Sequence, residues 1–119
     1  MNNSKWKLFQ DYIAEKLKEI DSYARSTKAS GASTEKGDVL NSVNLHIECK
    51  LRNTSSITIK NDVWQKLNQE IPLHSDKLPI LALENKEGKR WVVLGLDDFI
   101  NIYIEWYIMK FKNESGEQI

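Results

Sequence analysis

Cysteine is almost absent from this chain, because Cys49 is the only one among its 119 residues. A single thiol excludes an internal disulfide, and it suits a reducing compartment such as the cytoplasm. The chain also has only two histidines, His46 and His74. One cysteine and two histidines cannot make a four-ligand zinc site by themselves. We therefore expect a cytoplasmic protein.

Long apolar runs are missing as well. No stretch of about eighteen apolar residues occurs, which excludes a membrane-spanning helix. The N-terminal stretch MNNSKWKLFQDY lacks the apolar segment of a signal peptide. No internal repeat is present, and 119 residues fit one domain with a modest core.

Excess charge of either sign is absent, since 17 basic and 17 acidic residues cancel. Zero net charge argues against a protein that coats nucleic acid by bulk charge. The distribution is nevertheless uneven, because residues 25–66 contain seven basic and four acidic side chains. The middle of the chain is therefore positive.

The stretch LHIECKLR, residues 45–52, alternates apolar and polar side chains. A period of two predicts a β-strand whose successive side chains point to opposite faces of a sheet. One face carries Leu45, Ile47, Cys49 and Leu51, and the other carries His46, Glu48, Lys50 and Arg52. Upstream, GDVL at 37–40 enters a strand and NSVN at 41–44 can turn it back. An antiparallel return brings Asp38 towards Glu48 and Lys50.

Two carboxylates and a lysine at this point suit a magnesium site. Mg²⁺ prefers oxygen ligands, usually one or two carboxylates together with water and substrate phosphate. Asp38 and Glu48 can supply the carboxylates, and the carbonyl of Cys49 can add a neutral oxygen. Lys50 would then lie where it can orient the water or stabilise charge on the phosphate. The alternative is a solvated strand face with an ion pair between Glu48 and Lys50.

This arrangement resembles the PD-(D/E)XK nuclease superfamily, whose signature is an acid, a hairpin and then (D/E)-X-K. The matching residues here are Asp38, Glu48 and Lys50, with Gly37 where the family usually has proline. The resemblance implies catalytic roles for these three residues, with Mg²⁺ as the cofactor and Mn²⁺ as its substitute. It covers roughly residues 9–83, and its strongest motifs are KGDV and IECK.

The loop SYARSTKASGASTEK, residues 22–36, directly precedes the first acid. Its hydroxyls, backbone N–H groups and basic side chains can contact phosphates, although a flexible linker is the alternative. The pattern Arg25…Ser30-Gly31 resembles the loop of archaeal-type and phage-type Holliday junction resolvases, which implies contact with the DNA backbone. The full set of expected DNA-binding residues is Arg25, Lys28, Ser30, Lys36, Arg52 and Lys66.

Residues 5–20 have the apolar spacing of an amphipathic helix, with Phe9, Ile13, Leu17 and Ile20 on one stripe. In resolvase-like members of the superfamily, a glutamate of the first helix joins the metal site. The stripe places that position near Gln10. The sequence therefore departs from the pattern, or the role has moved to Asp11 or Glu15. We take Glu15 as the expected additional ligand, and a solvated helix acid is the alternative.

The remaining elements follow from apolar spacing. A second helix is expected over 60–71, packed on the sheet face that carries Ile47 and Cys49. The other expected elements are a short strand or extended run at 57–59, strands at 78–83 and 91–96 joined by a turn, and a helix at 97–112. This order predicts a single α/β domain over 1–112 with a mixed central sheet flanked by helices, of the restriction-endonuclease-like class. The polar tail 113–119 is expected to be disordered.

The expected function is therefore that of a Mg²⁺-dependent, structure-selective DNA endonuclease, most like a Holliday junction resolvase of DNA recombination. The small size, without an added recognition domain, favours recognition of branched or four-way DNA over recognition of sequence. Two alternatives remain open. One is another nuclease of the superfamily, of the repair or restriction type. The other is a catalytically silent nuclease-fold module that only binds DNA or a protein.

The last helix, 97–112, has apolar residues on nearly every side. A lone surface helix normally keeps a polar face. Trp106, Tyr107 and Met109 would leave a monomer with an exposed patch of the kind that marks interfaces. We therefore expect a two-fold homodimer through this helix, and the alternatives are that the helix is central to the fold or that a different partner covers it.

Overall fold

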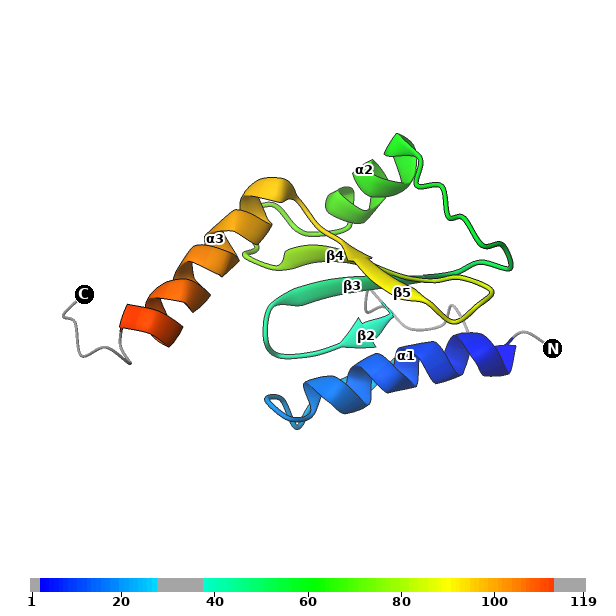
Figure 1. Ribbon diagram of the computed structural model, residues 1–119, viewed down its shortest axis with the longest axis horizontal. Helices are drawn as coiled ribbons and strands as arrows, with labels where there is room; N and C mark the ends of the chain where they lie inside the picture. The colour runs from blue at the N-terminus through cyan, green and yellow to red at the C-terminus, as the bar shows by residue number, and fades with distance from the viewer. Residues whose placement is uncertain (1–2, 28–37, 113–119) are drawn as a thin grey trace.

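The sheet has five strands in the order β1-β2-β3-β4-β5 (Figure 1). The computed structural model describes residues 3–27 and 38–112. The strands are β1 (Arg25–Ser26), β2 (Val39–Leu40), β3 (Leu45–Leu51), β4 (Leu78–Glu84) and β5 (Arg90–Val93). The pair β3 and β4 is parallel, whereas the other neighbours are antiparallel. The prediction of one α/β domain with a mixed sheet is confirmed.

Two helices cover opposite faces of this sheet, α1 (Asn3–Leu17) below and α2 (Asn61–Gln69) above in Figure 1. The helix α1 packs Phe9 and Ala14 against Val39, Ile47 and Cys49. This confirms the apolar face predicted for residues 45–51. The stripe residues Ile13 and Leu17 also join this cluster, whereas Ile20 lies beyond α1 and is exposed.

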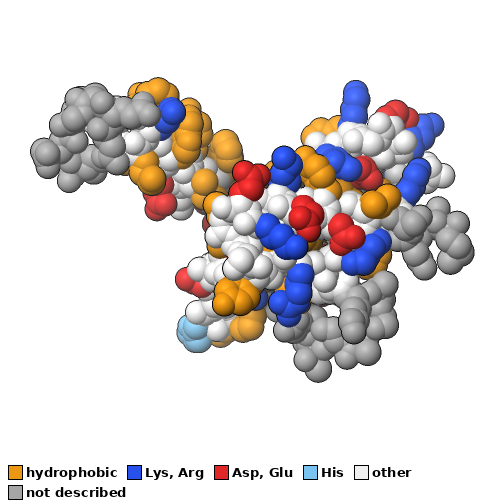
Figure 2. Space-filling model, turned by 90° about the horizontal axis from the view of Figure 1, so that it is seen from below, with side chains coloured by type: hydrophobic (Ala, Val, Ile, Leu, Met, Phe, Trp, Pro, Cys, Tyr) orange, Lys and Arg blue, Asp and Glu red, His pale blue; other side chains and the backbone are white. Residues whose placement is uncertain are grey.

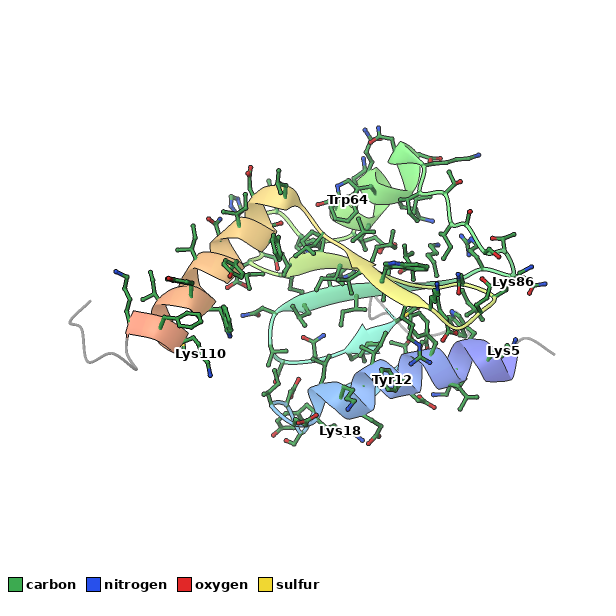
Figure 3. The ribbon with its side chains drawn as sticks, in the orientation of Figure 1. Lys5, Tyr12, Lys18, Trp64, Lys86 and Lys110 are labelled. Atoms are coloured by element: carbon green, nitrogen blue, oxygen red, sulfur yellow. The ribbon has the colours of Figure 1, made fainter. Side chains whose placement is uncertain are left out.

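The helix α2 packs on the other face, so the prediction that it would cover Ile47 and Cys49 is wrong. Its Leu67 contacts Leu81 and Leu83 of β4, and Trp64 lies on the side of α2 towards the sheet (Figure 3). The physical reason is that β4 is apolar on both faces. Ala82 packs into the cluster beneath α1. Leu81 and Leu83 point to the opposite face, where α2 buries them.

The turn between β2 and β3 is built by Asn41 and Asn44. The Asn41 carboxamide accepts hydrogen bonds from the N–H groups of Val43 and Leu45 and donates to two carbonyls. Asn44 has φ 66°, a left-handed conformation that Asn tolerates better than most residues. This turn reverses the chain within four residues, so that β3 runs back beside residue 38.

Residues 57–59 form no strand, which leaves the extended run as the remaining expectation, and Ile57 and Ile59 pack against the core beneath α2. The short strand β1 lies in the stretch predicted as a loop, where Ser26 pairs with Val39. The tail 113–119 lies outside the described residues.

The last helix, α3 (Leu96–Tyr107), continues into a π-helical turn, η1 (Ile108–Lys112). It projects away from the sheet (Figure 1), and none of its residues is buried. The alternative that this helix is central to the fold is therefore wrong. In the described ranges, no helix is both long and apolar enough to cross a membrane.

The layer between β4 and α2 predicts a stability difference. Leu81 is fully buried, whereas Val92 on the neighbouring strand is 62% exposed. Leu81→Ala should lower the free energy of unfolding by about 3 kcal/mol, because it leaves a cavity in a packed layer. The matched change Val92→Ala should cost less than about 1 kcal/mol. Urea denaturation measures both, and equal losses would contradict this packing.

Candidate functional site

Asp38 and Glu48 lie close together, Asp38 just before β2 and Glu48 on β3. Val39 pairs with Ile47 across the antiparallel ladder, and the Asp38 N–H donates to the Ile47 carbonyl at 2.7 Å. Glu48 alternates with the buried Ile47 and Cys49, so its side chain points to the face covered by α2. The charge of Asp38 acts on Glu48, and the charge of Glu70, just after α2, acts on both acids. Both carboxylates therefore lie on the α2 side of the sheet. The sequence predicted that they share a face, but it assigned the second helix to the opposite face.

A backbone donor orients the first carboxylate. The Cys49 N–H donates to Asp38 Oδ2 at 2.7 Å, a charge-assisted bond between two strands. On the same face, Lys50 Nζ lies 3.8 Å from Glu48 Oε2. That separation makes an ion pair but is too long for a hydrogen bond. The three residues predicted as catalytic are thus brought together on one face.

The pKa values of both carboxylates are raised above their ordinary values. For Asp38 the main cause is burial, which the Cys49 N–H and the Lys50 charge only partly offset. For Glu48 the main cause is again burial, and the neighbouring Asp38 charge raises its pKa further. Both groups are therefore held where negative charge is unfavourable, a situation common at functional sites.

A buried histidine and a third acid adjoin the pair. His46 is 3% exposed, and its Nε2 lies 3.1 Å from Glu70 Oε1, just after α2. An ionised carboxylate only accepts, so Nε2 is the donor in that pairing. The Glu70 charge raises the pKa values of both Asp38 and Glu48. Glu70 was not predicted as a site residue. The only feature of the sequence that could have indicated Glu70 is its position at the end of the helix that follows the E-X-K strand.

The donor set fits a hard divalent cation at two carboxylates. Mg²⁺ typically takes one or two protein carboxylates and keeps several waters. A cation would also relieve the charge that burial and proximity make unfavourable on Asp38 and Glu48. The Cys49 thiol points into the core beneath α1, and burial raises its pKa, so it stays protonated. Only the carbonyl of Cys49 remains as the neutral ligand proposed from the sequence.

The structure does not bring the first-helix acids to this pair. Glu15 is 69% exposed and pairs with Lys18, and Asp11 binds Lys7 and Ser26. Both belong to α1, which covers the opposite face. Across 3–27 and 38–112, no three His, Cys, Asp or Glu side chains form a group that could hold a metal. The expectation that Glu15 adds a ligand is therefore not met by this arrangement.

Gln10 lies where the resemblance expects the first-helix glutamate. It is fully buried, and neither its amide nitrogen nor its amide oxygen has a hydrogen-bond partner among the described residues. A buried amide without a partner is costly. The position for which the sequence pattern predicts an acid therefore holds a buried, neutral side chain.

The structure describes three of the six expected DNA-binding residues, and they lie in different places. Lys66 on α2 is near enough to Glu48 for its charge to lower that residue's pKa. Arg25 lines a cavity of about 340 Å³ together with His46 and Glu70. Arg52 follows β3 and lines another cavity, of about 550 Å³, with Lys5 and Lys86 at the end of the molecule where Figure 3 labels both. The other three, Lys28, Ser30 and Lys36, lie outside the described residues.

Comparison with known proteins adds no relative: no protein-family model, no curated protein and no solved structure matches this chain. The site is therefore interpreted from its own residues.

The raised pKa values predict how stability depends on pH. Folded Glu48 binds its proton more tightly than the unfolded chain does, so its contribution to stability is lost as pH rises above the ordinary value of 4.5. Glu48→Gln removes this penalty. The variant should therefore be more stable than the wild type at pH 7, and the difference should shrink below pH 4.5. Urea denaturation at pH 4 and pH 7 measures it.

The matched control is Glu19→Gln, the same change at an exposed carboxylate just after α1. It should shift the unfolding midpoint less at pH 7. A Glu48→Gln variant that is less stable than the wild type at pH 7 would contradict the unfavourable charge at this site.

Proposed function

We propose that this protein is a Mg²⁺-dependent DNA endonuclease of the PD-(D/E)XK type, and that it cuts branched DNA in the manner of a Holliday junction resolvase. The observation that carries the proposal is Asp38 close to Glu48, with Lys50 beside Glu48 on the same face. An acid, a hairpin and then Glu48-Cys49-Lys50, with the three side chains brought together, support the resemblance to the (D/E)-X-K pattern. Raised pKa values on both acids add an independent reason to regard the pair as functional.

Each residue has a distinct role in this proposal. Asp38 and Glu48 would hold the cation, with the Cys49 N–H keeping the Asp38 carboxylate in place. A bound Mg²⁺ supplies Lewis acidity and an activated water for attack on a phosphodiester. Lys50 is close enough to Glu48 to place a positive charge beside the scissile phosphate. Its ion pair is loose enough for the ammonium group to turn towards that phosphate.

The proposed substrate is DNA held by its phosphates. Lys66 lies near Glu48, Arg25 lines a cavity with His46 and Glu70, and Arg52 lies past the end of β3. Contacts with phosphates position a duplex without reading its bases. One small domain with such contacts suits recognition of DNA shape. Cleavage of a four-way junction would place the protein in DNA recombination.

A catalytically silent nuclease-fold module is the second candidate. The observation in its favour is Gln10, a buried neutral side chain at the position where the sequence pattern expects a glutamate of the first helix. Such a module would bind DNA without cutting it. A repair-type or restriction-type nuclease would share the site and differ in its substrate.

The central test is Glu48→Gln. It keeps the shape of the side chain but removes the charge that would hold the cation, so cleavage in Mg²⁺ should fall about a hundredfold or more. DNA affinity should stay within a few fold, because it comes mainly from phosphate contacts. Cleavage of labelled DNA and fluorescence anisotropy measure the two effects.

Glu19→Gln is again the control, and it should cleave at the wild-type rate. Undiminished cleavage by Glu48→Gln would refute the assignment of the metal ligand. Loss of cleavage in both variants would point to a general loss of folded protein, which circular dichroism would detect.

Lys66 tests the DNA contact separately. If it neutralises one phosphate, Lys66→Ala should reduce the steepness of log K against log salt concentration by about one. Lys16→Ala, on the helix that covers the opposite face, should leave that slope unchanged. Equal slopes for Lys66→Ala and the wild type would remove Lys66 from the DNA-binding surface.

A further inference from the structure

The segment α3–η1 exposes a broad apolar surface, interrupted only by a narrow polar stripe that contains Asn101 and Glu105. Ten large apolar side chains between residues 96 and 111 are exposed by 42% to 71%: Leu96, Phe99, Ile100, Ile102, Tyr103, Ile104, Trp106, Tyr107, Met109 and Phe111. Figure 2 shows hydrophobic side chains gathered on this projecting segment, apart from the body of the domain. An apolar helix face of this width is normally packed against other protein.

The amount of exposed surface matches that of a protein interface. Ten such side chains, each about half exposed and about 200 Å² in area, leave roughly 1,000 Å² of apolar surface in water. The largest apolar patch on a typical monomer is about 300–600 Å². Each partner in a stable complex buries about 800 Å². This segment alone therefore carries enough apolar surface for one side of a stable interface.

The charges at its two ends point to a second copy of the same chain. The first turn of α3 carries Asp97 and Asp98, and η1 carries Lys110 and Lys112. Two copies in antiparallel orientation put the acidic end of each beside the basic end of the other. With the centre at Ile104, residue 98 faces residue 110 of the partner. A parallel pair would instead put like charges side by side at both ends, which is unfavourable.

The packing of aromatic rings gives this segment a defined shape. Tyr103 lies 5.5 Å from Trp106 and 6.4 Å from Tyr107, and Tyr107 lies 4.8 Å from Phe111, measured between ring centroids. Lys110 is labelled at the far end of the segment in Figure 3. Rigid aromatic side chains lose little conformational entropy on association, and they are enriched at the energetic centres of interfaces.

We propose that the protein is a homodimer in which α3–η1 pairs antiparallel with its copy around a two-fold axis near Ile104. An axis of this kind lets one apolar surface cover itself. The proposal goes beyond the nuclease function and does not depend on it. The segment is also too short to cross a membrane, because its 17 residues span about 25 Å and carry charge at both ends.

The first experiment measures the mass of the full chain by light scattering at micromolar concentration. The expected mass is twice 13.8 kDa. Trp106→Glu should weaken the dimer about a hundredfold or more, because each dimer loses two central aromatic anchors. Leu73→Glu is the matched control, since Leu73 is 87% exposed on the main domain, and it should remain a dimer.

The second experiment measures orientation. Nitroxide labels on Leu96→Cys should lie about 24 Å apart along the paired helices. Residue 96 is eight positions, or about 12 Å, from the centre, and its copy in the partner lies the same distance on the other side. Labels on Ile104→Cys should lie close together. Cys49 is buried and shielded from the label.

Short separations at both positions would mean a parallel pair and would overturn the proposal. A monomer with unchanged circular dichroism would overturn it as well, as would a monomer that binds phosphatidylcholine vesicles through this segment. Cleavage by a monomer would leave the proposed function standing and refute only the dimer.

Discussion

The hydrogen bond from the Cys49 N–H to the Asp38 carboxylate is the contact on which the proposed site depends. Backbone pairing between β2 and β3 is short, and this bond continues the strand pairing through a side chain. It holds one acid close to Glu48 and leaves Lys50 beside them. On the other face of the same strand, Ile47 and Cys49 are buried beneath α1, so the packed core keeps the acidic face in register.

Placing these acids together works against stability. Burial raises the pKa values of Asp38 and Glu48. The negative charge of Asp38 raises the pKa of Glu48 further, and Lys50 and Lys66 do not cancel the combined effect. A sequence selected for stability alone would avoid this arrangement, whereas functional sites often retain such unfavourable charge. A bound divalent cation would reverse the effect. The buried negative charge that lowers stability is thus the same charge that would bind the cation.

Alternation in LHIECKLR was enough to predict which side chains share a face, because a strand has a strict period of two. The alternation could not show which helix covers which face, because α2 packs against Leu81 and Leu83 of β4, a separate strand later in the sequence. The sequence also could not show that Gln10 is buried or that Glu70 lies close to the two acids, because both depend on tertiary packing. Helical spacing identified 97–112 as apolar on nearly every side, but only the fold shows that it projects from the body.

The central claim is that Asp38 and Glu48 form a metal-dependent site for cutting branched DNA. The most direct measurement incubates the purified protein with a synthetic four-way junction in Mg²⁺, in Mn²⁺, in Ca²⁺ and in EDTA. The account predicts paired nicks in opposed strands in Mg²⁺ and in Mn²⁺ but not in Ca²⁺ or EDTA, because Ca²⁺ coordinates more loosely and rarely aligns water with phosphate. Junction DNA that is bound but remains intact in both Mg²⁺ and Mn²⁺ would contradict it.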